Sequence, residues 1–126
     1  MKSVHDYEVI SYEVNLREQY IIINTEYNGN KVTIEFTDVM AHLFEDQLHE
    51  SVLLDIDTYD IERFIEGNIE LLEIHKPYCW PTYYETMDEL RGKLIKEQYE
   101  YYVIFSSLGL NGWVLAKKMK FIKRES

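Results

Sequence analysis

The first third of the chain alternates apolar and polar residues with a period of two. Residues 9–16, VISYEVNL, place Ile10, Tyr12 and Val14 on one face and polar side chains on the other. This alternation is typical of a half-buried strand. Residues 20–27 are also rich in strand-forming residues, so two neighbouring strands are expected here.

The dipeptide Asn28-Gly29 separates these strands from a third alternating segment, residues 30–37. Asn-Gly favours the tight turn of a β-hairpin, because that turn needs two residues with positive φ. The pattern therefore predicts a meander of three antiparallel strands.

The next segment, MAHLFEDQLHE at residues 40–50, fits two different periods. As a helix, it carries His42 and His49 on one face with an acidic side chain between them, opposite an apolar stripe. As a strand, residues 39–46 continue the preceding hairpin. The two interpretations differ in function, because only the helix brings these three polar side chains together.

Two helices are expected in the middle of the chain. Asp57 or Thr58 is the expected N-cap of the first, since such side chains accept hydrogen bonds from the first turn. Its expected buried stripe consists of Ile61, Phe64, Ile65, Ile69 and Leu72. Gly67-Asn68 either breaks this helix or weakens it. The second helix is expected to begin at Thr82, where TYYE matches a capping box.

Residues 99–107 and 111–121 return to the strand pattern, and Asn111-Gly112 predicts a second hairpin between them. The segments together predict about seven strands and two helices, in the order five strands, two helices, two strands. Strands joined by short turns are antiparallel, so the expected fold is α+β, with both helices packed on one face of an antiparallel sheet. A length of 126 residues favours one globular domain, residues 1–126.

Composition points to the cytoplasm. The chain has no apolar run of about 18 residues, the minimum for a membrane-spanning helix. Its first ten residues, MKSVHDYEVI, lack the apolar stretch of a signal peptide. A single cysteine, Cys79, leaves no pair for an internal disulfide, which is usual in a reducing compartment.

The charge is negative and unevenly distributed. The net charge is −10, and five of the 13 basic residues lie after residue 116. Residues 45–73 contain ten acidic side chains and one basic side chain, Arg63. A field of this sign repels nucleic acid and anionic membranes and attracts basic partners. The alternative is that these acids only keep the surface soluble.

Catalytic chemistry has little support. A metal-dependent enzyme centred on His42 and His49 requires the helical interpretation, and known helical zinc sites space their histidines by four residues rather than seven. Cys79 has His75 four residues upstream, but an isolated cysteine is more often a small buried apolar residue. The sequence contains no nucleotide-binding glycine loop and no paired CxxC. We therefore expect no catalytic residue, no metal ligand and no cofactor.

The second half of the chain resembles a known group of sequences. The segments VLLDIDTYDIERFI, CWP and YYVIFSSLGLNGWVLAKKM, within residues 31–121, resemble small, acidic, uncharacterised bacterial domains. Some of these look like immunity or accessory proteins encoded beside polymorphic toxins. In sequences of this kind the segment before LLDID looks like a strand, which favours the strand interpretation of residues 39–46.

The resemblance and the charge together imply a non-catalytic protein-binding module, an immunity-type inhibitor of a basic, toxin-like protein. Eleven tyrosines are consistent with an interface, because tyrosine buries area at low entropic cost. The residues expected to bind the partner are Asp57, Tyr59, Asp60, Glu62, Glu66, Glu70 and Glu73. The alternatives are a domain that binds a small ligand between sheet and helices, and the metal-dependent enzyme. Exposed edge strands also allow a dimer.

Overall fold

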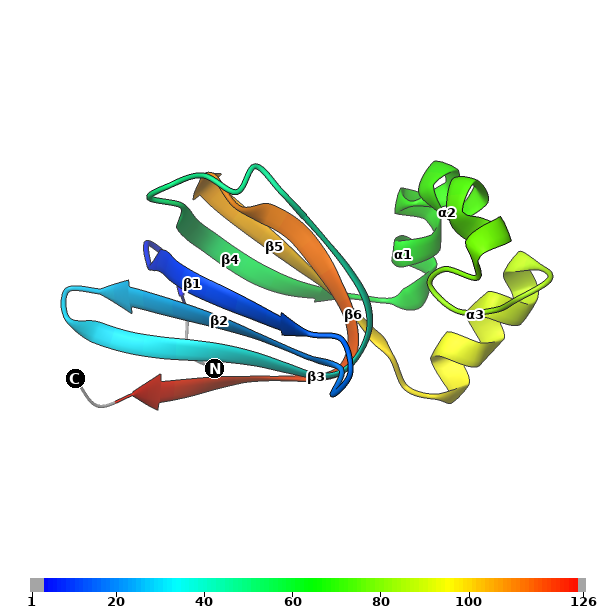
Figure 1. Ribbon diagram of the computed structural model, residues 1–126, viewed down its shortest axis with the longest axis horizontal. Helices are drawn as coiled ribbons and strands as arrows, with labels where there is room; N and C mark the ends of the chain where they lie inside the picture. The colour runs from blue at the N-terminus through cyan, green and yellow to red at the C-terminus, as the bar shows by residue number, and fades with distance from the viewer. Residues whose placement is uncertain (1–3, 125–126) are drawn as a thin grey trace.

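Residues 4–124 are described by a computed structural model, and they form six β-strands and three α-helices (Figure 1). The elements are β1 (Glu8–Asn15), β2 (Tyr20–Tyr27), β3 (Asn30–Glu45), β4 (Val52–Tyr59), α1 (Ile61–Gly67), α2 (Ile69–His75), the short 3-10 helix η1 (Lys76–Tyr78), α3 (Met87–Lys96), β5 (Glu100–Leu108) and β6 (Asn111–Arg124). The predicted α+β class and antiparallel sheet are confirmed, but the numbers of strands and helices differ. That residues 1–126 form one domain stays a prediction, and residues 1–3 and 125–126 lie outside the described part.

The six strands close into a barrel in the order β1-β2-β3-β6-β5-β4. All neighbouring strands are antiparallel. The seam between β1 and β4 is the shortest, with one aligned pair, Glu8 and Val52. The backbone N–H of Leu53 donates to the carbonyl of Tyr7 across this seam (2.9 Å). The barrel is thus held shut on this side by a short contact.

Strands β3 and β6 are long because each contributes to two sides of the barrel. Residues 30–37 of β3 pair with β2, while β6 pairs along nearly the whole of β3. A register shift between Val39 and Ala41 marks a bulge in β3, and bulges bend a strand. Figure 1 shows β6 curving from one layer of strands into the other. The strand interpretation of residues 39–46 is confirmed, but this segment continues β3, which explains six strands instead of seven.

The barrel interior is filled by alternate residues of the strands. Its buried members include Ile21, Ile23, Ile34, Phe36, Leu53 and Ile104. Burial of each such side chain contributes about 1.5–3 kcal/mol relative to exposure. Strand β1 departs from simple alternation, because a register shift between Val9 and Ser11 leaves Ile10 outside the pairing and 54 % exposed.

The helices gather beyond one end of the barrel (Figure 1). They pack on β3, β5 and β6 through a second buried cluster, in which the Phe64 ring lies 5.2 Å from Trp113 and 5.3 Å from Tyr101. In β6, Val114 belongs to the barrel interior and Leu115 to the layer beneath the helices. Both faces of β6 are therefore buried at this end. We call residues 60–96, which contain the helices, the helical cap.

The first predicted helix is divided in two at Gly67-Asn68. The backbone N–H of Asn68 donates to the carbonyl of Ile65 (3.2 Å), and its side-chain Nδ2 donates to the carbonyl of Phe64 (2.8 Å). These bonds end α1, and α2 begins at Ile69. The glycine and the competing amide explain why three helices form rather than two. No helix in residues 4–124 is long and apolar enough to cross a membrane.

Both predicted N-caps were misplaced. Asp60, rather than Asp57 or Thr58, caps α1, and its Oδ1 accepts a hydrogen bond from the backbone N–H of Arg63 (2.9 Å). The reason is that β4 continues to Tyr59, so its ladder holds the two predicted caps in extended backbone.

The second helix begins four residues later than the capping-box pattern suggests. Thr86 caps α3, and its Oγ1 accepts from the backbone N–H of Glu89 (3.1 Å). Thr82 instead accepts a hydrogen bond from Nζ of Lys93 (3.0 Å), which ties the linker to α3.

The two Asn-Gly dipeptides behave differently. Asn28 and Gly29 both have positive φ, +50° and +80°, and form the predicted hairpin turn. The second predicted hairpin also forms, between β5 and β6, but it turns at Gly109, whose φ is +84°. Asn111 and Gly112 already belong to β6.

Candidate functional site

The acidic residues predicted to bind a partner fall into two groups. Those at the start of the helical cap have structural partners. Asp60 caps α1 through Arg63, as described above. Glu62 accepts hydrogen bonds from the guanidinium of Arg91, one of them at 3.1 Å from Nη2, and Arg91 also binds Asp88 (2.6 Å). These contacts raise the pKa of Arg91 and hold α1 against α3.

Tyr59 is not a free aromatic anchor. It is half-buried, and the guanidinium of Arg63 lies 4.3 Å from its ring centroid. The other side packs near Tyr101, with ring centroids 6.4 Å apart. Asp57 is also half-buried, in β4 opposite Val103. Both residues are therefore less available to a partner than the sequence suggests.

The second group of predicted acids has no such partners. Glu66, Glu70 and Glu73 are exposed and form no hydrogen bond or ion pair within residues 4–124. They lie at the end of α1 and along α2. Of the seven predicted residues, these three carry unneutralised charge at the surface.

A hollow with both apolar and polar side chains in its lining lies beside two of these acids. It has a volume of about 590 Å³ at the junction of α1 and α2. We call it the cap groove, defined by Leu43, Glu66, Ile69, Glu70 and Ile74. Ile69 is 39 % exposed and Ile74 is 64 % exposed. The groove thus combines exposed aliphatic side chains with two unpaired carboxylates, which we call its acidic rim.

Sequence reasoning missed the apolar part of this groove. It placed Ile69 on the buried stripe with Ile65 and Leu72, both of which are buried. The break at Gly67-Asn68 interrupts the helical register, so Ile69 no longer follows α1 into the core. The Gly67-Asn68 dipeptide was the signal in the sequence that Ile69 could leave the buried stripe.

Two of the three tyrosines of the helical cap are exposed. Tyr78 is 79 % exposed and Tyr83 is 60 % exposed, and both lie between α2 and α3. Tyr84 is buried in the cluster beneath the helices, together with Tyr101 of β5. The cap therefore presents two aromatic side chains at its surface.

The space between sheet and helices holds packed side chains. Phe64, Leu90, Leu94 and Leu115 are fully buried there, and Trp113 is almost fully buried. A small ligand in this layer, the alternative considered from sequence, would have to displace this packing.

The two histidines do not share a helix face. His42 lies in β3, half-buried, with its ring 5.0 Å from that of Phe44. His49 lies in the loop before β4, almost fully exposed and 3.9 Å from a carboxylate oxygen of Glu50. Across residues 4–124, no group of three or more His, Cys, Asp or Glu side chains could hold a metal ion. The helical geometry required by the metal hypothesis does not form.

Cys79 and His75 are also separate in their contacts. Cys79 is exposed, and the ring of His75 packs against Trp80 at 5.5 Å. No hydrogen bond joins Cys79 to His75 among the described residues. The arrangement does not activate the thiol.

The buried part of His42 predicts a pH effect on stability. Burial lowers the pKa of His42 below its ordinary value of 6.5. As the pH falls through 6.5, the unfolded chain therefore binds a proton that the folded chain does not yet bind, and the free energy of unfolding decreases. Replacing His42 with phenylalanine removes this contribution. We expect the variant to lose less stability than the wild type between about pH 7 and about pH 5, measured by urea unfolding.

The matched control is Leu48→Phe, which places the same ring at an exposed position, 56 % exposed in the wild type, and changes no titrating group. It should follow the wild-type pH dependence. If the His42 variant and the wild type lose stability in parallel, burial of the imidazole has no role in acid sensitivity.

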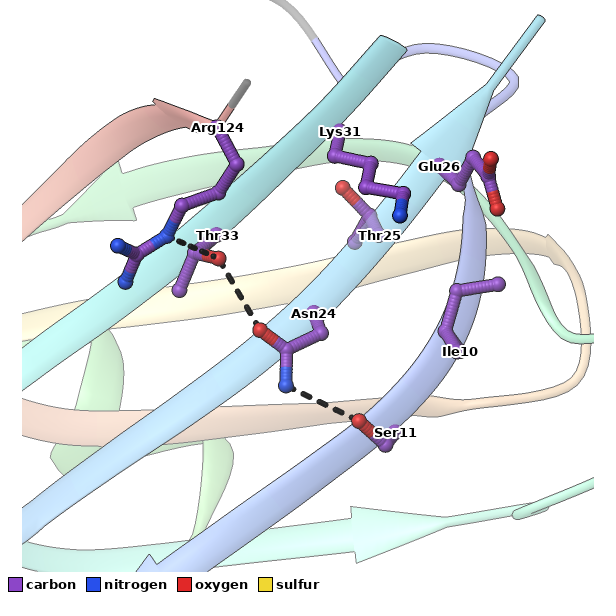
Figure 2. Close-up of a pocket in the computed structure, with 8 residues that line it drawn as sticks. All are labelled: Ile10, Ser11, Asn24, Thr25, Glu26, Lys31, Thr33 and Arg124. Atoms are coloured by element: carbon purple, nitrogen blue, oxygen red, sulfur yellow. Dashed lines mark hydrogen bonds between the residues drawn. The ribbon is translucent and has the colours of Figure 1, made fainter. Parts of the chain in front are cut away.

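A second hollow lies on the outer side of the barrel, away from the helical cap. It has a volume of about 410 Å³ and is lined by Ile10, Ser11, Asn24, Thr25, Glu26, Lys31, Thr33 and Arg124. Figure 2 shows a row of hydrogen bonds across it, from β6 through β3 and β2 to β1. We call this hollow the barrel trough. Its lining combines the apolar side chain of Ile10 with polar side chains and both signs of charge.

Comparisons of the chain with known protein families, with curated proteins and with solved structures find no match.

Proposed function

We propose that this chain is a non-catalytic protein-binding module whose helical cap binds a basic protein partner. The observation that carries the proposal is the cap groove, where exposed Ile69 and Ile74 lie beside unpaired Glu66 and Glu70. Exposed aliphatic side chains give up water on binding, and this supplies affinity. The acidic rim selects a partner with lysine or arginine around an apolar centre.

The electrostatics favour fast association with such a partner. The net charge of −10 and the five acids within residues 60–73, against one base, favour a negative field around the cap. Fields of this kind steer oppositely charged proteins and raise their association rate. Glu66, Glu70 and Glu73 contribute fully, because no cation within residues 4–124 pairs with them.

The partner class follows from the resemblance of the sequence to bacterial immunity-type domains. We propose an inhibitor in the bacterial cytoplasm that binds a basic, toxin-like protein. An inhibitor of this kind needs a rapid encounter and no catalytic residue. Glu73 adds a further free acid on α2, and Tyr78 and Tyr83 are exposed between α2 and α3.

The experiment is a comparison of two double charge reversals. Tagged wild type captures its partner from the source cells, and the purified partner is then titrated by calorimetry. We expect a basic protein, with affinity that decreases as salt is raised. Glu66→Lys together with Glu70→Lys should weaken binding by about tenfold or more, because both rim charges become repulsive.

The control reverses two exposed acids outside the cap, Glu18 and Glu50, to lysine. It changes the net charge equally and should retain most of the affinity. Co-expression of the wild type should also relieve the growth defect caused by the partner. An acidic partner, or equal loss in both double variants, would contradict the proposal.

A further inference from the structure

We propose that the barrel trough binds a small anionic ligand through a carboxylate or phosphate group. Arg124 and Lys31 supply the positive charge, and the polar body of the ligand lies over Thr33, Asn24 and Ser11 (Figure 2). The site lies on the outer side of β1, β2, β3 and β6 and shares no residue with the cap groove. It is independent of the protein partner proposed above.

Two cations occupy neighbouring positions in the trough. Lys31 in β3 and Arg124 in β6 are aligned partners in the sheet, so their side chains leave the same face. Neither forms an ion pair with a carboxylate in residues 4–124, whereas Lys120, further along β6, reaches Glu35 at 3.4 Å. Lys31 is also aligned with Glu26 of β2, and Figure 2 shows its ammonium turned toward that side, while the guanidinium of Arg124 is turned away from it. Arg124 is therefore the cation that a bound anion would contact directly.

The orientation of Arg124 is already set. Its Nε donates to Oγ1 of Thr33 (3.2 Å), which is almost completely buried. The two terminal nitrogens make no hydrogen bond within the described residues, and Figure 2 shows them projecting beyond Thr33. A guanidinium with both terminal nitrogens free presents a fork that matches carboxylate and phosphate oxygens.

The floor of the trough is ordered in the same way. Thr33 Oγ1 donates to Oδ1 of Asn24 (3.0 Å), and Nδ2 of Asn24 donates to Oγ of Ser11 (3.0 Å). This chain of bonds uses the Ser11 oxygen as an acceptor and leaves its hydroxyl hydrogen to donate. Groups held in place before binding lose little conformational entropy when a ligand arrives. The floor therefore offers fixed polar contacts to the ligand body.

Size and charge limit the ligand. A hollow of about 410 Å³ lies within the range of small-molecule sites. The exposed side chain of Ile10 adds an apolar wall, and Glu26, the partner of Lys31 on β2, places a negative charge on the far side. A polyanion such as nucleic acid is disfavoured by Glu26 and by the net charge of −10. The trough fits a small anion with a neutral or positively charged far end.

The test is a titration followed by two-dimensional amide NMR at low salt. The probes are inorganic phosphate and glycerol phosphate as phosphate sources, succinate and glutamate as carboxylate sources, and glycerol as the neutral control. We expect at least one anion, and not glycerol, to shift amide signals of β2, β3 and the end of β6. Whether phosphate or carboxylate probes bind tighter identifies the ligand class. Arg124→Gln should weaken binding about tenfold or more, since a charge-assisted fork is lost.

The matched control is Lys123→Gln. It removes the same charge from the adjacent residue, which alternation in β6 directs to the other face. Lys31→Gln should weaken binding less than Arg124→Gln does, since Lys31 adds positive charge without direct contact, and both variants should keep the wild-type spectrum elsewhere. The Glu66→Lys, Glu70→Lys variant should bind the probe normally, which separates this site from the cap. The proposal is overturned if no anion shifts the trough signals at about 10 mM, the weak end of the expected range, or if Lys123→Gln weakens binding as much as Arg124→Gln.

Discussion

Replacing Gly112 with alanine is expected to destabilise the protein by about 4 kcal/mol or more, a loss seen only when a substitution disrupts the core or backbone. Gly112 lies in β6 between Phe44 of β3 and Ile104 of β5. A Cβ at this position would lie 1.9 Å from the carbonyl oxygen of Leu43 and 3.0 Å from the Cα of Phe44. These are backbone atoms of a paired strand, so they cannot move without separating β3 from β6. Urea unfolding at neutral pH measures the effect.

Gly92→Ala is the control for this substitution. Gly92 lies inside α3, and a Cβ there meets no atom within 4 Å. Alanine in a helix interior is expected to be stabilising by about 0.5–1 kcal/mol. A free energy of unfolding for Gly112→Ala within about 1 kcal/mol of the wild-type value would be an ordinary mutational effect. It would mean that β6 leaves room for a Cβ beside the backbone of β3.

Replacing Phe64 with alanine is expected to cost about 3–5 kcal/mol, the usual range for a buried aromatic residue. Phe64 is fully buried between the helical cap and the barrel, in edge contact with Trp113 and Tyr101. Its removal leaves a cavity and loses these ring contacts. Because the Phe64 ring packs directly on Trp113, near-ultraviolet circular dichroism should also change as the Trp113 environment loosens.

The control removes an aliphatic side chain from the outer surface of the same cap. Ile95 in α3 is 59 % exposed, and Ile95→Ala should change stability by less than about 0.5 kcal/mol. Equal losses in the two variants would mean that Phe64 does not join cap and barrel.

Local patterns in the sequence predicted the class of fold. Period-two alternation identified the strands, and Asn28-Gly29 identified a hairpin turn that forms as expected. The strand interpretation of residues 39–46 was also correct, but the local pattern fitted both a helix and a strand, the resemblance favoured the strand, and the segment belongs to β3. The alternating strands and the hairpin turn depend on neighbouring residues along the chain, so they can be read from sequence.

The candidate sites were only partly predictable. The acidic segment was visible, and Glu66, Glu70 and Glu73 are indeed exposed and unpaired in the described structure. That Glu62 binds Arg91 depends on the packing of α1 against α3, 29 residues away in sequence. Sequence alone could not distinguish an acid that faces solvent from one that holds two helices together.

The barrel trough gave no sequence signal at all. Ser11, Asn24, Thr33 and Arg124 lie on four different strands, and each is an ordinary polar residue on the outer side of the barrel. Strand register alone aligns them, through pairing of β1 with β2, β2 with β3, and β3 with β6.

By itself, the sequence determined the antiparallel α+β class, the positions of most strands and the negative charge of residues 45–73, because each depends on local periodicity or composition. The tertiary structure alone decided the closure of the sheet into a barrel and the sharing of β3 and β6 between two sides. It also decided which charges are free. The physical reason is that burial and strand register are set by contacts between residues distant in sequence, and these contacts select among local conformations of similar energy.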